Sequence, residues 1–99
     1  MISMKCIQGR SCPVVICDKC QEQITEAGDA MVVFDTDYKD GQESRTEYFH
    51  KRSCDPGKKV TTWVELSNFL ADLTHNTGLR GKKFTDAVAQ SKRHTEAGL

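Results

Sequence analysis

Four residues arranged in two pairs constrain this chain more than any other feature of its sequence. Cys17 and Cys20 form a C-x2-C pair, His50 and Cys54 form an H-x3-C pair, and 29 residues separate Cys20 from His50. Structural Zn²⁺ sites use four tetrahedral ligands drawn from Cys thiolates and His imidazoles. The two pairs therefore predict one structural Zn²⁺ ion, held by these four side chains.

The size and composition of the chain make such an ion useful. The chain has 99 residues, enough for one domain, of which 37% are hydrophobic and 28% are charged. So little apolar material makes a small core, and a metal or disulfides often stabilise chains of this size. The five cysteines are an odd number, which argues against a closed disulfide framework and favours a cytoplasmic protein with reduced thiols.

The sequence gives no sign of a membrane or secretory segment. The start of the chain has no long apolar run behind a basic segment, so no signal peptide is predicted. The longest apolar runs, Val14–Ile16 and Ala30–Phe34, are far shorter than a bilayer requires. We therefore expect no membrane partner.

Two β-prone runs, at residues 30–34 and 43–50, flank a turn signal at Asp40-Gly41. They predict a β-hairpin over residues 30–50 with a loop of six to eight residues, which would return His50 towards Cys20. Asp35 to Gly41 is similar to a calcium-binding loop, but its glycine comes one place late, so we expect an acidic hairpin loop instead. Pro13 to Ile16 is predicted to be extended.

The helix that follows the hairpin is the most strongly predicted element in the chain. Thr62 and Glu65 have the spacing of a capping box, and Gly78 is a natural stop. Between them an apolar stripe recurs at helical spacing, and it consists of Trp63, Leu66, Phe69, Leu70 and Leu73. A weaker second helix is predicted over residues 82–93, followed by a frayed end at residues 94–99.

These elements predict a small α+β fold, with a zinc knuckle and a β-hairpin packed against an amphipathic helix. The boundaries expected are 1–12 for an unassigned N-terminal segment, 13–78 for the zinc domain with the main helix, and 79–99 for the C-terminal helix and tail. Cys6 and Cys12 lie in or at the end of the unassigned segment. We expect free thiols there, with a substitute ligand, a second partial site or a mutual disulfide as the alternatives.

The spacing of the four ligands resembles that of the zinc finger of poly(ADP-ribose) polymerases, which binds DNA breaks. The resemblance covers residues 13–60, and the family has H-x2-C where this chain has H-x3-C at His50 and Cys54. The spacing also resembles that of half a LIM domain, in which the cysteine pair and the His/Cys pair lie closer together in the sequence. The chain also looks like small bacterial zinc proteins of unassigned function, which share the Cys-Asp-x-Cys knuckle, the His-Lys-x-x-Cys pair and the helix that here reads Trp63-Val64-Glu65-Leu66-Ser67-Asn68-Phe69-Leu70.

Charge and motif content leave two functions open. Net charge is zero, but residues 18–47 carry nine acidic and three basic residues and the remainder carries a matching basic excess. The first function is a nucleic-acid-binding module, with phosphate contacts from Lys51, Arg52, Lys58, Lys59, Arg80, Lys82 and Lys83. The alternative is a protein-interaction adaptor, which predicts an exposed apolar patch.

No catalytic motif is present, and four protein ligands leave a zinc ion no open position, so no enzyme activity is expected.

Overall fold

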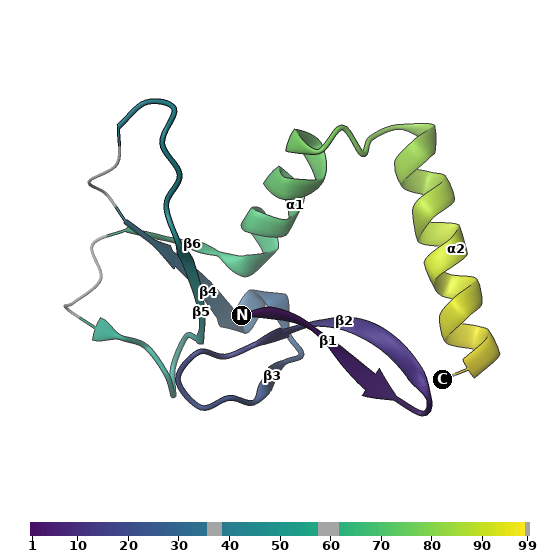
Figure 1. Cartoon of the computed structure of the whole chain (residues 1–99), viewed down its shortest axis with the longest axis horizontal. Coiled ribbons are helices and arrows are strands. Elements are labelled where there is room, and N and C mark those ends of the chain that lie inside the picture. The colour runs from purple at the N-terminus through teal and green to yellow at the C-terminus, as the bar shows by residue number, and fades with distance from the viewer. Residues whose placement is uncertain (36–38, 58–61, 99) are drawn as a thin grey trace.

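Two three-stranded antiparallel sheets and two α-helices make up the part of the chain that the computed structural model describes, residues 1–35, 39–57 and 62–98 (Figure 1). This small α+β architecture confirms the predicted fold class. In chain order the elements are β1 (Ile2–Ile7), β2 (Arg10–Ile16), β3 (Gln23–Ile24), the 3-10 turn η1 (Ala27–Asp29), β4 (Ala30–Phe34), β5 (Thr46–His50), β6 (Trp63–Glu65), α1 (Leu66–Asn76) and α2 (Lys82–Gly98).

The first sheet has the order β1-β2-β3, and residues 1–12, which were left unassigned from the sequence, form β1 and the start of β2. Gln8 and Gly9 form the two-residue turn between β1 and β2, with φ angles of 51° and 78°. Positive φ at both central residues is what a type I′ hairpin turn requires, and glycine adopts it without strain. A lone Gly9 between weakly alternating strands was the signal for this hairpin. The predicted extended segment from Pro13 to Ile16 is confirmed as part of β2.

The second sheet has the order β5-β4-β6 and contains the predicted hairpin. β4 and β5 pair antiparallel, with Val32 opposite Tyr48 and Ala30 opposite His50. The connection spans residues 35–45, longer than the six to eight residues expected, because β5 begins at Thr46 rather than at residue 43. The backbone N–H of Asp35 bonds the Ser44 hydroxyl at 2.8 Å across its base. The calcium-like segment falls partly on residues 36–38, outside the described residues.

The start of the main helix was predicted wrongly. Trp63 belongs to β6, which pairs with the free edge of β4, and α1 begins only at Leu66. Glu65 occupies the N-cap position with extended backbone, and no side chain caps the helix, so the proposed capping box from Thr62 does not form. The physical reason is competition: aromatic and β-branched residues at 63 and 64 satisfy an open sheet edge better than a helical turn.

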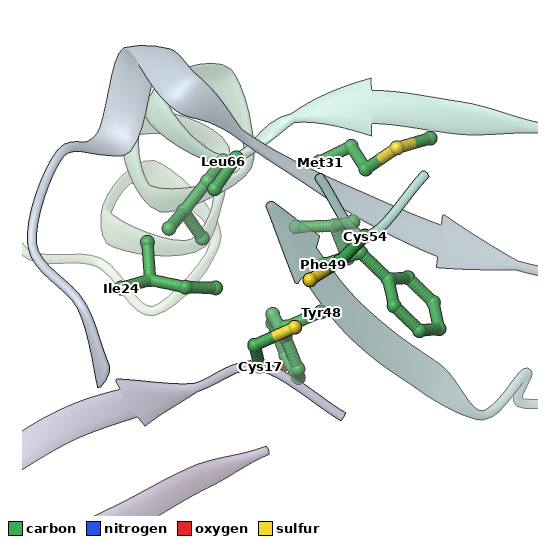
Figure 2. Close-up of a cluster of buried hydrophobic side chains, with 9 residues drawn as sticks. Cys17, Ile24, Met31, Tyr48, Phe49, Cys54 and Leu66 are labelled. Atoms are coloured by element: carbon green, nitrogen blue, oxygen red, sulfur yellow. The ribbon is translucent and has the colours of Figure 1, made fainter. Parts of the chain in front are cut away.

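The core lies between α1 and the inner face of the second sheet. Leu66 is almost fully buried, and the Phe69 ring meets Tyr48 edge to face with centroids 6.0 Å apart. Figure 2 shows that two cysteines, Cys17 and Cys54, are members of this same cluster. The predicted metal ligands therefore lie at the border of the core and not on a separate loop.

α1 ends where the sequence predicted. Gly78 has a φ of 78°, its N–H bonds the carbonyl of His75 at 3.0 Å, and the N–H of Leu79 bonds that of Thr74 at 3.1 Å. These two bonds form a Schellman motif, which satisfies the last carbonyls of the helix. α2 continues to Gly98, beyond the predicted end at residue 93, so the frayed end expected for residues 94–98 is not found. Figure 1 shows that α1 and α2 diverge from the connection between them, with α2 on the side away from the β5-β4-β6 sheet.

Candidate metal centre

The first pair of predicted ligands lies on a tight turn that follows β2. The N–H of Cys17 bonds the carbonyl of Glu22 at 2.9 Å, and the N–H of Gln21 bonds the carbonyl of Cys17 at 3.0 Å. Gln21 adopts a φ of 64°, which closes the turn. This backbone geometry presents the sulfur atoms of Cys17 and Cys20 to one side.

The second pair comes from the end of β5 and the turn after it. His50 is the last residue of β5, and Cys54 lies four residues further on. The β4–β5 hairpin returns the chain to the first pair, as predicted. Two further hydrogen bonds join the turn to β5: Asp18 donates its N–H to the carbonyl of Tyr48 at 2.8 Å, and Tyr48 donates its N–H to Oδ2 of Asp18 at 2.7 Å.

All four candidate ligands converge. The ligand atoms of Cys17, Cys20, His50 and Cys54 lie within 4.8 Å of one another, and Sγ of Cys20 is 3.5 Å from Nδ1 of His50. Bonds of about 2.0–2.3 Å to a tetrahedral ion would separate ligand atoms by roughly 3.3–3.8 Å. The four atoms therefore need to move by only about 1 Å to coordinate one metal ion. The arrangement can bind a metal.

The site is half inside the core and half exposed. Cys17 and Cys54 are buried, with relative exposures of 0% and 4%, whereas His50 is half-buried and Cys20 is exposed. The buried thiols pack among the apolar side chains drawn in Figure 2. The packing of the core would therefore depend directly on an ion bound here. Because Cys20 is exposed, such an ion would reach the site from solvent on the side of Cys20.

Hydrogen bonding prepares Cys17 to act as a thiolate. Burial by itself raises the pKa of the Cys17 thiol. Backbone N–H groups of Cys20, His50 and Lys19, together with the Cys54 thiol, favour the anion more strongly and lower that pKa from 9.0 to about 6. A ligand that is already deprotonated near neutral pH costs less to bind to a metal.

The other two ligands respond to that anionic neighbour. A hydrogen bond with Cys54 raises the pKa of His50, burial opposes it, and hydrogen bonding and charge from Cys17 add to the rise. For Cys20 the N–H of Glu22 lowers the pKa, but burial and the neighbouring Cys17 and Cys54 sulfurs outweigh it and raise the value above 9.0. Without a cation, these ligands therefore compete for protons.

The remaining cysteines lie apart from this cluster. In the β1–β2 register Cys6 is opposite Ser11, and Cys12 is opposite Lys5. Neighbouring residues of a strand point to opposite faces, so Cys6 and Cys12 face away from each other and cannot form the mutual disulfide kept as an alternative. Among the described residues, neither belongs to the group that could hold a metal. Both are free thiols, as expected.

The candidate phosphate contacts that the structure describes do not gather at one place. Nζ of Lys51 bonds Oε1 of Glu65 at 2.5 Å and lies 5.9 Å from the centre of the Trp63 ring. Arg52 is exposed next to it. The other described candidates lie at the α1–α2 connection and the first turn of α2, on the opposite side of the view in Figure 1, and they are Arg80, Lys82 and Lys83. Lys58 and Lys59 lie outside the described residues.

Sequence reasoning missed one contributor to the site. Asp18, inside the C-x2-C pair, joins the turn to β5 and also binds the amino group of Met1 at 3.1 Å. Its position between two cysteines is a sequence signal, because a short acidic residue in a turn commonly accepts backbone N–H bonds. Its actual partner, Tyr48, is 30 residues away and could not be read from local sequence.

Comparisons with family models, with curated proteins and with solved structures find no match for this chain. Among the helices that the structure describes, none is both long enough and apolar enough to cross a membrane.

Proposed function

We propose that this chain binds one Zn²⁺ ion through Cys17, Cys20, His50 and Cys54. The observation that carries the proposal is the convergence of three thiols and one imidazole within 4.8 Å. Three sulfur ligands and one nitrogen ligand in a tetrahedral arrangement suit Zn²⁺ better than the hard cations Mg²⁺ and Ca²⁺, which prefer oxygen. The lowered pKa of Cys17 supports the same assignment, because the thiolate is the form that binds zinc.

The role proposed for the ion is structural. With four protein ligands, its coordination is complete and no position is left for water or substrate. It would join three segments: the turn after β2, the end of β5, and the turn that leads to β6 and α1. Because the two buried thiols belong to the core, we expect the core to loosen when the ion is removed.

Metal content and metal-linked stability test this proposal together. Native mass spectrometry of the protein purified without added metal should show one zinc per chain, and a strong chelator should lower its thermal midpoint. The matched control is a chelator-treated sample to which one equivalent of Zn²⁺ is returned, which should recover the midpoint. A protein that contains no zinc, and whose midpoint responds to neither treatment, would contradict the proposal.

The function that this scaffold supports best is a protein-interaction module. Leu70, Leu73, Phe84 and Val88 remain 37–44% exposed on α1 and α2, and exposed apolar side chains such as these support an adaptor. The nucleic-acid alternative has less support: Lys51 is paired with Glu65, and the other described candidates are divided between two separate regions. The resemblance to the poly(ADP-ribose) polymerase finger stays a prediction, and DNA binding is tested separately below.

A further inference from the structure

β1 is an edge strand, because among the described strands it pairs with β2 alone. The amino group of Met1 donates to the carbonyl of Ile16 at 2.6 Å, and the N–H of Ile16 donates to the carbonyl of Met1 at 2.7 Å. Hydrogen-bonded pairs alternate along an antiparallel ladder, so the bonds from β1 to β2 come from its odd-numbered residues. The even-numbered residues point their N–H and C=O groups away from β2, and they are Ile2, Met4 and Cys6.

The same three residues also carry exposed side chains. Their side chains share one face of the sheet, because successive side chains of a strand point to opposite faces. Ile2 and Met4 are 52% and 62% exposed, and Cys6 is exposed as well. An edge with unpaired backbone groups and apolar side chains is a template for pairing with another strand. The outer edge of β1 is therefore suited to the addition of a strand.

The other described strand edges are less complete. Pro13 of β2 lies opposite Met4, and the alternation points its backbone nitrogen to the outer edge of β2, where proline has no N–H to donate. On β5, Tyr48 already uses its N–H and C=O in bonds with Asp18. β3 and β6 have only two and three residues. Among the described strands, β1 thus presents the longest run of unpaired donors and acceptors.

We propose that β1 pairs antiparallel with β1 of a second copy of this chain, across a two-fold axis at Met4. In this register Met4 faces Met4 of the second copy, and Ile2 faces its Cys6. Every outward N–H and C=O group then has a partner, because each such pair exchanges two hydrogen bonds. The pairing joins two three-stranded sheets into one. It depends neither on a zinc ion nor on the exposed side chains of α1 and α2.

The composition of β1 favours a second copy as the partner. Two-fold symmetry requires a surface that is complementary to itself. Lys5 is the only charged residue of β1, and in the proposed register it faces Ser3 of the second copy. An axis at Lys5 would set two lysines opposite each other, which is destabilising, and an axis at Ser3 would leave Cys6 unpaired. β1 therefore supplies alternating apolar side chains and an uncharged partner for its own lysine in one register.

Sedimentation velocity of the full chain over a range of concentrations tests the pairing. The expected result is a monomer–dimer equilibrium with a dissociation constant of about 10–100 μM, because a contact made by one strand is smaller than a standard stable interface. The dimer should form in protein whose thiols are kept reduced, since the contact is made by backbone hydrogen bonds and not by a disulfide.

A pair of charge variants locates the contact. Met4→Lys sets two lysines opposite each other at the axis and should weaken dimerisation about tenfold or more. Ser11→Lys is the matched control, because it adds the same charge to β2, at an exposed residue opposite Cys6 and away from the outer edge of β1. It should change the dissociation constant less than about threefold. Circular dichroism and zinc content should be unchanged in both variants, since neither residue belongs to the metal centre.

A disulfide tests the register. Cα atoms of a hydrogen-bonded antiparallel pair lie about 5.5 Å apart, a separation that a disulfide can span. With oxidised glutathione, Ile2→Cys should therefore form a covalent dimer, because its new thiol faces Cys6 of the second copy. Ser3→Cys directs its thiol to the other face, opposite Lys5, and should remain monomeric in non-reducing electrophoresis. The original chain should also remain monomeric, because its Cys6 faces Ile2.

Each remaining outcome decides against the pairing or for it. A chain that stays monomeric at about 500 μM, far above the expected dissociation constant, overturns the inference. Dimers that survive Met4→Lys and are lost in Phe84→Ala place the contact on the helices and overturn it too. Covalent dimers from Ser3→Cys but not from Ile2→Cys contradict the register at Met4. A dimer sensitive to Met4→Lys in protein that holds no zinc supports the pairing and contradicts the metal proposal alone.

Discussion

The sulfur of Cys20 lies 3.5 Å from Nδ1 of His50, although the two residues are 30 positions apart in the chain. Closing a loop of that length costs conformational entropy, and the β4–β5 hairpin contributes to meeting that cost. Asp18 contributes again through its bonds to Tyr48. The four groups otherwise compete for protons, and a bound cation would supply the attraction between them.

Replacing one ligand tests this attraction directly. Cys54→Ser should lower zinc affinity by more than about 100-fold, because even residues that only support a metal ligand are commonly worth 10–100-fold. It should also lower the thermal midpoint, since Cys54 is a buried member of the core cluster. Competition with a chromophoric chelator measures the affinity, and differential scanning calorimetry measures the midpoint.

Cys12→Ser is the matched control for that experiment. It changes the same atom, but in β2 opposite Lys5 and outside the metal-competent group. Zinc affinity should stay within about threefold of the original. If Cys12→Ser instead loses zinc while Cys54→Ser retains it, the ligand set is wrong and Cys12 is the substitute ligand that its spacing from Cys17 allows.

Asp18→Ala should destabilise the fold without changing the ligand set. The substitution removes the acceptor for the backbone N–H of Tyr48, a bond of 2.7 Å between the turn and β5. Leaving that buried N–H unpaired should reduce the free energy of unfolding by about 1–3 kcal/mol. Urea denaturation of the zinc-loaded protein measures it. Lys19→Ala, next in the chain, should have a much smaller effect, and equal losses from both variants would show that the Asp18 bond is not special.

The convergence of the four candidate ligands and the main hairpin were predictable because both leave compact signals in the sequence. The Cys17–Cys20 pair and the His50–Cys54 pair are each local in the sequence. Residues 30–34 form one continuous apolar run, which favours a buried strand. The β1–β2 hairpin was missed because its strands alternate weakly and Gly9 is its only turn signal. Cys6 and Cys12 were interpreted only as thiols, whereas the structure shows that they belong to the strands β1 and β2.

The start of α1 could not be read correctly for a different reason. Trp63 lies at helical spacing from Leu66 and Phe69, so the local pattern favours one continuous helix. The structure instead pairs Trp63 with Val33, a contact between residues 30 positions apart. The free edge of β4 is a feature of the tertiary structure that the local sequence does not reveal. Pairing with that edge overrides the local preference of Trp63 for a helix. The same non-local pairing places Lys51 beside Glu65.

Core and surface substitutions in this region should therefore differ sharply. Leu66→Ala removes a side chain that is 3% exposed and should cost about 2–5 kcal/mol of unfolding free energy. Trp63→Ala removes one that is 48% exposed, and should cost about 1 kcal/mol, including its contact with Lys51. Urea denaturation of both variants decides the matter. A larger loss of unfolding free energy from Trp63→Ala than from Leu66→Ala would instead indicate that Trp63 is a core residue, as the helical pattern predicted.

DNA binding is the sharpest test between the two functional alternatives. Because Lys51 is paired and the other described basic residues are divided, we expect at most non-specific affinity, with dissociation constants of about 10⁻⁴–10⁻⁶ M at physiological salt. Anisotropy with labelled single-stranded, blunt and nicked DNA across a salt series measures it, with a chelated sample as control. Nanomolar binding that prefers nicked DNA and is lost on chelation, and that falls in Arg52→Ala, would instead support the polymerase-type finger.

Zinc affinity should rise with pH, because the ligands must lose protons to bind. Cys17, with a pKa lowered from 9.0 to about 6, is already largely ionised at pH 7 and contributes little to the slope there. Cys20, with a pKa raised above 9.0, still holds its proton and must release it on binding. Affinity should therefore increase at least about tenfold per unit between pH 7 and 8, because at least one proton is displaced per zinc.

The metal-free protein should show the same chemistry in its stability. The folded-state pKa of Cys17 lies below its unfolded value of 9.0, so its stabilising contribution is complete above pH 9 and is lost as the pH falls towards 6. Cys17 should consequently contribute less stability to the chelator-treated protein as the pH falls from 9 to 6, so the difference in stability between the original chain and Cys17→Ser should narrow over this range. Calorimetry across this range measures both proteins. A profile that is flat for the original chain and unchanged by Cys17→Ser would mean that the thiolate is not stabilised by its backbone N–H partners, and the preorganisation argued for the metal centre would fail with it.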